Sequence, residues 1–560
     1  MDAFDQGSSL VRRHVLGRSA TIDTPFGRRL VYYADLTATG RHLDLVEAWV
    51  DRARAHYANT HTAVATTGAH MTRLREDARA VIRRAVGAGP DDHVLFCGSG
   101  ATAATNKLVG LLGWRVSEPL ARELGLGRDI PPALRPVVFV GPYEHHSNEL
   151  PWRESVADVV TIDLDARGRI DLADLEAALA AHHDRPMKLG AFSAASNVTG
   201  VLTDVAAVAR LLHRHGALAV FDFAASGPYV PIDMHPADPE ARLDAIVVSP
   251  HKFVGGPESS GVLVASAALF RTRTPERPGG GTVEYVSRAG EPDYARDLHE
   301  REEGGTPAIM GDLRAGLAFL VKDMVGAEAI RAHEIGIARA ALERLSRHPR
   351  IRLLGPTDVD RLAIVSFNVE GLHHDLVSAL LDHLFGIQNR AGCACAGPYG
   401  HRLLGIDEAR SERFRALIHR GVIGMKPGWV RLSLPWYATA DDLDFVLGAV
   451  ELVADHGEAF LPLYRLGWQD GVWHHAAGPA SVSPPLTLTL ASLLEAAEAP
   501  RPAPIDEPTM TRERARYRAE ALAIAAELEA RRAASPPIVS PPTGDPEIDA
   551  LAWFRWVTAG

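Results

Sequence analysis

The sequence predicts an α/β protein with a mostly parallel central sheet and a second, smaller α+β domain. Two apolar runs carry this prediction, Leu218–Phe221 and Asp244–Val248, because each is short and ends beside a polar residue. A third run, 94–96, leads through a glycine turn into a helical pattern. Ligands of open α/β sheets bind at the carboxyl ends of the strands, so the residues that follow these runs are candidates for a site.

Length and composition indicate an ordinary globular protein of several domains. The chain has 560 residues, of which 46% are hydrophobic and 23% charged. We expect residues 1–75 to join the small domain, 76–322 to form the large domain, 323–455 the small C-terminal domain and 456–560 an accessory tail with a helix and a Pro-rich linker.

Charge and hydropathy exclude several classes of protein. The formal net charge is −11 and no Lys/Arg-rich block occurs, which argues against a nucleic-acid partner. The N-terminus lacks the features of a signal peptide, and no long uncharged apolar run occurs, so we expect a cytoplasmic protein with no membrane contact. Three cysteines cannot form a disulfide framework, so their placement matters more than their number.

Asp222 and Lys252, each close to the end of a predicted strand, have the chemistry that binds pyridoxal 5′-phosphate (PLP). A PLP enzyme needs an amine to bond the aldehyde and a carboxylate to keep the pyridine nitrogen protonated. Either residue alone is equally compatible with a turn-capping aspartate or a solvated surface lysine. Their combination at neighbouring strand ends favours PLP.

Three further segments add candidate contacts to a cofactor. The turn 97–102, with Ala101 and Thr102 at a predicted helix start, could hold a phosphate, although such turns are common. His145 and His146 follow the strand 137–140; neighbouring side chains diverge and no further ligand completes a metal site, so we favour stacking of one imidazole on a cofactor ring. Asn197 could bond a ring substituent or form an ordinary turn.

These motifs together resemble the class V aminotransferase-fold enzymes of the cysteine desulfurase and selenocysteine lyase group, from about residue 31 to 450. Tyr33–Thr39 is similar to the opening motif of the family, and Glu144–Asn148 to its Glu-His-His-x-Asn signature. The resemblance implies PLP-dependent fold type I. It assigns the PLP phosphate to Ala101, Thr102, Ser249 and His251, the ring nitrogen to Asp222, the ring oxygen to Asn197, the ring face to His145 and the aldehyde to Lys252.

Two motifs outside the central sheet extend the resemblance. Gly304–Pro307 is similar to the family segment that reaches the phosphate of a partner subunit, which implies a homodimer with Thr306 at the interface. The strand 430–434 is similar to the one whose arginine binds the substrate carboxylate, which implies that Arg431, with Asn197, binds substrate.

The segment Asn389–Pro398 decides the predicted activity. Family desulfurases carry Arg-x-Gly-x-x-Cys here, a spacing that falls on Cys395 rather than Cys393. The resemblance implies a desulfurase in which Lys252 moves the α-proton of L-cysteine and the Cys395 thiolate takes the sulfur as a persulfide, leaving alanine. Lys252, Cys395 and His145 are the predicted catalytic residues, and no metal is expected.

Other interpretations of the same residues stay open. Cys395 could be incidental in a class V aminotransferase, epimerase or C–S β-lyase, or the chain could be a silent protein that binds a sulfur carrier. A Cys-x-Cys metal site has only two visible ligands. Cys393 replaces a frequent family histidine and could relay sulfur, form a reversible disulfide with Cys395, or do nothing.

Some parts depart from the family or lie outside it. Ala225 stands where the family usually has a glutamine, and an insertion with a helical pattern at Glu412–Ile418 could cover the site or present sulfur to an acceptor protein. In the tail we expect a charged helix over 511–532, an extended linker over 535–542 and an apolar anchor over 551–556 that docks in cis or on a partner.

Overall fold

The computed structural model describes residues 3–124, 130–483, 487–498, 504–533 and 540–557. The chain divides into two units, each made of three separate stretches. The large unit contains Met1–Val15, Thr37–Ile335 and Asp358–Leu362, and the small unit contains Leu16–Leu36, Gly336–Thr357 and Ala363–Gly560. The domain boundaries expected at 75, 322 and 455 stay a prediction.

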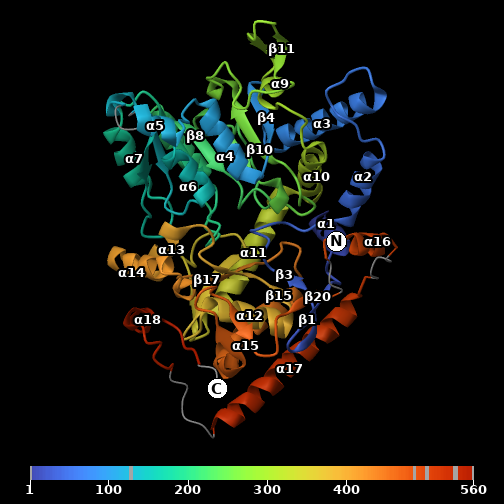
Figure 1. The fold of residues 1–560 in the computed structure, drawn as a ribbon, viewed down its shortest axis with the longest axis vertical. Helices are drawn as coiled ribbons and strands as arrows, with labels where there is room; N and C mark the ends of the chain where they lie inside the picture. The colour runs from blue at the N-terminus through green and yellow to red at the C-terminus, as the bar shows by residue number, and fades with distance from the viewer. Residues whose placement is uncertain (1–2, 125–129, 484–486, 499–503, 534–539, 558–560) are drawn as a thin grey trace. The chain divides into compact units, whose positions relative to one another are not determined.

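A seven-stranded sheet with the order β4-β10-β9-β8-β7-β5-β6 forms the centre of the large unit (Figure 1). Its strands are β4 (Asp92–Cys97), β5 (Val137–Val140), β6 (Asp158–Thr161), β7 (Lys188–Ser193), β8 (Leu218–Asp222), β9 (Ala245–Val248) and β10 (Gly261–Ser266). Strands β9, β8, β7, β5 and β6 are parallel, while β10 runs antiparallel to both β9 and β4. The predicted mostly parallel sheet is confirmed.

The large unit has helices before β4, between the strands of the sheet and after β10. They are α1 (Ala3–His14), α2 (Asp44–Arg54), α3 (Thr66–Ala85), α4 (Gly100–Leu111), α5 (Glu118–Leu124), α6 (His146–Arg153), α7 (Leu172–Ala181), α8 (Val205–Arg214), α9 (Leu298–Glu302) and α10 (Ile309–Val325). Asp204 caps α8 by accepting a hydrogen bond from Ala207 N at 3.0 Å, and Leu212 buries the inner face of that helix. Leu108 of α4 packs with sheet residues Leu95 and Leu189 in one buried cluster. The large unit also contains the hairpin β11 (Val283–Val286) and β12 (Pro292–Tyr294).

The small unit is built around an antiparallel sheet with the order β13-β14-β17-β16. These strands are β13 (Ile351–Leu353), β14 (Ile364–Val369), β16 (Arg390–Gly392) and β17 (Trp429–Ser433). The remaining strands are β1 (Thr21–Thr24), β2 (Gly27–Leu30), β3 (Tyr32–Tyr33), β15 (Ile387–Gln388), β18 (Tyr464–Leu466), β19 (Trp473–His475) and β20 (Ser481–Ser483). Its helices include α12 (His374–Phe385), α13 (Gly397–Leu404), α14 (Glu408–His419), α15 (Ala440–His456), α16 (Leu490–Glu498), α17 (Glu507–Ala533) and α18 (Pro546–Leu551), while α11 (Ala327–Ser346) contains the boundary at residue 335.

The expected tail helix is present as α17, which runs as one long helix along the small unit (Figure 1). It packs on α12 and α15, and its alanines Ala521 and Ala525 are buried. Tyr517 accepts a hydrogen bond from Leu30 N at 3.0 Å through its hydroxyl, which joins the helix to β2. Most of the expected linker, residues 534–539, lies outside the described residues.

The C-terminal anchor docks on its own chain, within the small unit. Phe554 and Trp556 are buried, and Arg555 N donates a hydrogen bond to Gly371 O at 3.0 Å. Phe554 lies edge-on to His373, with 4.5 Å between the ring centres. The sequence left docking in cis and docking on a partner open, and the structure shows the first.

Replacing Phe554 with alanine should lower the free energy of unfolding by about 3 kcal/mol, because a buried ring is lost from a packed aromatic cluster. The midpoint of denaturant unfolding measures this change. Arg555→Ala is the matched control: its side chain is 51% exposed and pairs with Glu458, so the loss should stay below about 1 kcal/mol. Equal losses from both variants would contradict a buried anchor.

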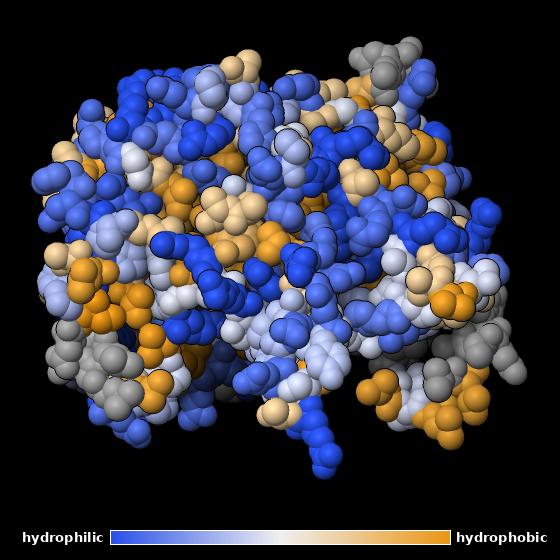
Figure 2. Space-filling view, turned by 90° about the horizontal axis from the view of Figure 1, so that it is seen from above, coloured by the Kyte–Doolittle hydropathy of each residue, from blue (hydrophilic) through white to orange (hydrophobic). Residues whose placement is uncertain are grey.

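The face seen in Figure 2 is mostly hydrophilic, and its hydrophobic residues form several separate patches. Among the helices that the structure describes, none is long and apolar enough to cross a membrane.

Candidate active site

Asp222 and Lys252 lie at neighbouring strand ends in the large unit. Asp222 is the last residue of β8, and Lys252 ends the short 3₁₀ turn Pro250–Lys252 that follows β9. Asp222 is buried and its Oδ1 accepts a hydrogen bond from Ala224 N at 2.7 Å. Burial raises the pKa of Asp222, while that hydrogen bond and the positive charge of Lys252 lower it. The structure therefore places the amine within electrostatic reach of the carboxylate.

The glycine turn before α4 and the segment after β9 form one cradle. Gly100 has φ +58°, and a Cβ there would lie 2.6 Å from His251 Cε1 and 2.9 Å from Ser249 Oγ. Ala101 N donates a hydrogen bond to Ser249 Oγ at 2.9 Å, and Thr102 Oγ1 lies 2.6 Å from Ser147 Oγ. The predicted phosphate residues are thus brought together at a helix N-terminus.

His251 in this cradle is held in its neutral form. Its pKa is lowered to about 4, chiefly by burial and further by the charge of Lys252. A neutral imidazole next to a phosphate site can donate one hydrogen bond while it adds no charge of its own.

His145 caps α6, with Nδ1 accepting a hydrogen bond from Ser147 N at 3.1 Å. The neighbouring Glu144 is buried, and burial raises its pKa to about 7. Glu144 Oε2 accepts from Ser193 Oγ at 2.6 Å and from Asn148 Nδ2 at 2.7 Å, which ties α6 to β7. Glu144 thus fixes the turn that carries His145, a role that sequence reasoning missed although the residue lies in the quoted signature.

Asn197 and Thr306 lie in two other loops of the large unit. Asn197 is buried after β7, in a turn whose Ser196 Oγ accepts from Val198 N at 3.2 Å and Thr199 N at 3.1 Å. Thr306 is exposed, and its Oγ1 accepts a hydrogen bond from Asn59 Nδ2 at 3.4 Å. The predicted roles of both residues stay predictions.

In the small unit, Arg431 shares a buried carboxylate with a second arginine. Arg431 Nη2 donates to Asp35 Oδ1 at 3.0 Å, and Arg390 donates to Asp35 Oδ2 through Nε at 3.0 Å and Nη2 at 2.7 Å. Burial lowers the pKa of Arg431, and the charge of Asp35 opposes this shift. Arg390 and Arg431 stand opposite each other on β16 and β17, so the sheet register sets this arrangement. Sequence reasoning quoted Asp35 and Arg390 but missed the pairing.

Cys395 lies in a tight turn next to these arginines. Ala396 N donates a hydrogen bond to Cys393 O at 3.2 Å, and the two central residues have positive φ, 49° at Ala394 and 55° at Cys395. Positive φ at both central positions defines a type I′ turn, which normally uses Gly, Asn or Asp. Cys395 is exposed and Cys393 half-buried. The hydrogen bond to Asp35 is the main factor that raises the pKa of Arg390, and the negative charge of Cys395 adds to it.

The Ala394→Gly variant should be more stable by about 1 kcal/mol. Glycine removes a left-handed penalty of about 1–2 kcal/mol, and part of that gain is offset by the entropy of the unfolded chain. Denaturant unfolding gives the difference. Ala391→Gly, the same change in β16, should instead lose about 0.5–1 kcal/mol. A destabilised Ala394→Gly protein would contradict the strained turn.

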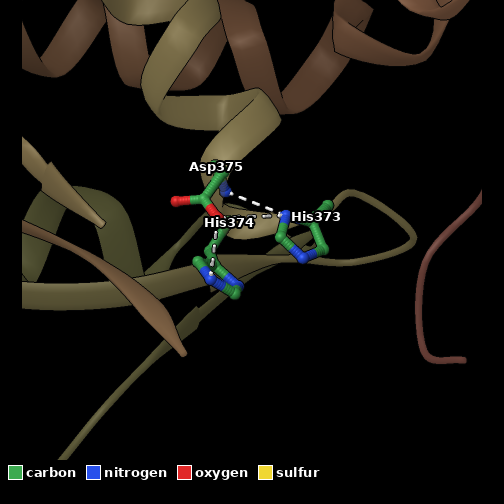
Figure 3. A group of neighbouring side chains, drawn as sticks. All are labelled: His373, His374 and Asp375. Atoms are coloured by element: carbon green, nitrogen blue, oxygen red, sulfur yellow. Dashed lines mark hydrogen bonds and ion pairs between the residues drawn. The ribbon is translucent and has the colours of Figure 1, made fainter. Parts of the chain in front are cut away.

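The sequence predicted no metal site, and the structure brings His373, His374 and Asp375 together at the start of α12, with ligand atoms within 4.8 Å of one another (Figure 3). His373 Nδ1 accepts a hydrogen bond from Asp375 N at 3.1 Å, and its Nε2 lies 3.2 Å from Gly424 O. Trp553 of the tail is stacked nearly parallel to His374. These contacts describe a helix cap packed on the C-terminal anchor.

The predicted site residues thus fall into two sets. Lys252, Asp222, His145, Asn197, Thr306 and the phosphate cradle belong to the large unit, and Cys395 and Arg431 to the small unit. The first set combines a lysine amine, a buried carboxylate and a helix N-terminus with hydroxyl groups, and the second has an exposed thiol beside two guanidinium groups.

Two comparisons of the sequence with known proteins give related results. Residues 32–446 match the family Aminotransferase class-V. A probable cysteine desulfurase of Halalkalibacterium halodurans is 32% identical over 376 residues, which cover 66% of this chain and 85% of that relative. A cysteine desulfurase of Dickeya dadantii is 28% identical over 76% of this chain and 92% of that relative.

Solved structures give the same result. The apo cysteine desulfurase of Thermococcus onnurineus NA1 matches with a TM-score of 0.62 and 27% identity, covering 76% of this chain and 95% of that structure. These similarities confirm the predicted fold type I and the resemblance to the cysteine desulfurase group. The chain therefore belongs to the aminotransferase class-V family.

Proposed function

We propose that this protein is a PLP-dependent cysteine desulfurase that transfers sulfur from L-cysteine to Cys395 and releases alanine. The observation that carries the proposal is Cys395 itself, an exposed cysteine held in a tight turn near Arg390 and Arg431. The names of its relatives support the same reaction.

The residues of the large unit fit PLP. A Cβ at Gly100 would clash with His251 and Ser249, so glycine lets these two side chains approach the N-terminus of α4, where free backbone N–H groups suit a phosphate. Asp222 is a buried carboxylate of the kind that keeps a pyridine nitrogen protonated, and Lys252 supplies the amine. PLP, when bound, provides an electron sink next to the α-carbon of an amino acid.

Each protein group then has one task in the reaction. Arg431 binds the α-carboxylate of L-cysteine, and Lys252 moves the α-proton. The Cys395 thiolate attacks the substrate sulfur, so that a sulfur–sulfur bond forms while the substrate carbon–sulfur bond breaks. The former β-carbon takes up a proton, and alanine leaves.

We also propose the oligomeric state of the enzyme, its location and its partner. It acts as a homodimer in the cytoplasm, with Thr306 contributing across the interface to the cofactor of the partner. A sulfur-acceptor protein takes the persulfide sulfur from Cys395, whose exposure permits this transfer. The expected helical insertion is present as α14, next in the chain after α13, and offers an exposed face for that acceptor.

The test is to incubate the holoenzyme with L-cysteine, quantify alanine, sulfide, pyruvate and ammonia, and map persulfide by peptide mass spectrometry. Alanine equal to the sum of released sulfide and sulfur retained on Cys395 supports the proposal. Pyruvate and ammonia would instead indicate β-elimination, and neither product would turn attention to transamination or epimerisation of other amino acids.

The matched variants are Cys395→Ala and Cys97→Ala. Cys97 lies in the core of the large unit, where burial raises its pKa to about 12, so its thiol takes no part in sulfur transfer. Cys395→Ala should lose sulfur release while Cys97→Ala retains it. Full sulfur release by Cys395→Ala would overturn the persulfide mechanism.

A further inference from the structure

A second cysteine lies two residues before the proposed nucleophile, in the same turn. Cys393 occupies the first position of the type I′ turn and Cys395 the third. Two Cα–Cα steps of about 3.8 Å that meet near a right angle place these Cα atoms about 5.4 Å apart. Disulfides span about 4.4–6.8 Å between Cα atoms, so this spacing suits a bond between the two sulfurs.

Both ends of the turn are fixed by packing, which keeps the two cysteines close. On the N-terminal side Gly392 pairs with Trp429 of β17. A Cβ at Gly428 would lie 2.7 Å from both Gly392 Cα and His374 Nε2, so the strand before the turn is closely covered. On the C-terminal side the buried Ala396 leads directly into α13.

The positive φ values of Ala394 and Cys395 are a second indication that this turn is a functional site. Alanine and cysteine rarely adopt positive φ, and such conformations persist where the surrounding structure holds them, often at functional sites. A looser loop of ordinary conformation would serve a single nucleophilic thiol equally well. In this turn the two thiol-bearing residues stand two positions apart, at the first and third places.

We propose that Cys393 is a resolving cysteine that cleaves the persulfide on Cys395, an inference that rests on the proposed desulfurase function. The Cys393 thiolate attacks Sγ of Cys395, the bond between Sγ and the outer sulfur breaks, and that sulfur leaves as hydrosulfide. The two cysteine sulfurs are oxidised to a disulfide, and the outer sulfur is reduced to sulfide. No external oxidant is needed.

This reaction makes sulfide release depend on a thiol reductant. Each cycle without an acceptor ends with the Cys393–Cys395 disulfide, in which the nucleophile is blocked. A small thiol or a protein dithiol must reduce that bond before the next L-cysteine reacts. A sulfur acceptor would compete with Cys393 for the persulfide.

The experiment is a single addition of excess L-cysteine to the reduced holoenzyme with no other thiol reductant, followed by an acid quench and tryptic digestion. Cleavage after Arg390 and Arg402 gives one peptide, 391–402, that holds both cysteines and excludes Cys97. We expect this peptide to be about 2 Da lighter than its reduced form, with close to one sulfide released per subunit. Excess L-cysteine is itself a thiol and can reduce the disulfide. The reaction is therefore quenched within the first turnover.

The Cys393→Ser variant supplies the comparison. We expect it to form alanine in the first turnover as the parent does. Its peptide 391–402 should stay about 32 Da heavier than the reduced form of the same variant, and it should release at least about tenfold less sulfide than the parent. A stable persulfide on Cys395 of the parent would overturn the inference, as would a persulfide on Cys393, which would indicate a sulfur relay. Absence of alanine from both proteins would instead contradict the proposed function itself.

Discussion

The Lys252→Ala variant should form alanine from L-cysteine at least about 10³-fold more slowly than the parent. Removing the amine takes away the group that moves the α-proton and the group that holds the cofactor aldehyde. The loss should appear in kcat, because L-cysteine can still meet Arg431. The measurement is alanine formation at saturating L-cysteine with PLP added in excess.

Lys188→Ala is the matched control for this variant. Lys188 begins β7 in the same sheet, and its Nζ makes one exposed hydrogen bond, to His183 O at 3.3 Å. Its activity should stay within about twofold of the parent, since such surface contacts are energetically small. An unfolded Lys252→Ala protein is recognised by circular dichroism, and a folded one that keeps a tenth of the activity would refute the role of Lys252.

The Arg431→Gln variant should have a KM for L-cysteine raised by about 10–100-fold. A guanidinium can bind a carboxylate through two parallel hydrogen bonds, and a buried one loses little of that attraction to solvent. Glutamine keeps the approximate size and a donor but removes the charge. Initial rates over a wide range of L-cysteine concentrations separate the effect on KM from that on kcat.

Arg390→Gln separates substrate binding from the support of Asp35. Arg390 donates two hydrogen bonds to Asp35, whereas Arg431 donates one, so both variants leave that carboxylate short of a partner. If Arg431 binds substrate, its variant raises KM clearly more than Arg390→Gln does. An equal rise in KM from both variants would mean that each substitution acts by disturbing Asp35. The proposed role of Arg431 in binding the substrate carboxylate would then be wrong.

Sequence patterns predicted the parts of the fold that depend on local hydrophobicity. The apolar runs 218–221 and 244–248 are the parallel strands β8 and β9, and the helical pattern at 412–418 lies inside α14. The antiparallel direction of β10 was less accessible, because this strand is as fully buried and apolar as its parallel neighbours. The antiparallel β10 between β9 and β4 is visible only from its hydrogen bonds.

Sequence patterns likewise predicted only part of the candidate site. Motifs identified Lys252, Asp222 and Cys395 because their neighbours in the chain are distinctive. The Asp35 carboxylate between two arginines was missed, since nothing in the spacing of residues far apart in the sequence reveals a shared partner. The strain in the cysteine turn was equally hidden, because Ala394 has no left-handed preference of its own.

The division of the small unit among three stretches has a consequence for how the protein is made. Asp35 leaves the ribosome 355 residues before Arg390, one of the two arginines that neutralise it. At about 5–20 residues per second this wait lasts about 20–70 s, during which the continuous segment 37–335 of the large unit emerges. Strands β1 and β2 can pair with each other inside segment 16–36, but β3 has no partner strand until Ile387 and Gln388 are made. A chaperone that shields this early segment should therefore raise the yield of folded protein, whereas slower synthesis, which prolongs the interval, should lower it.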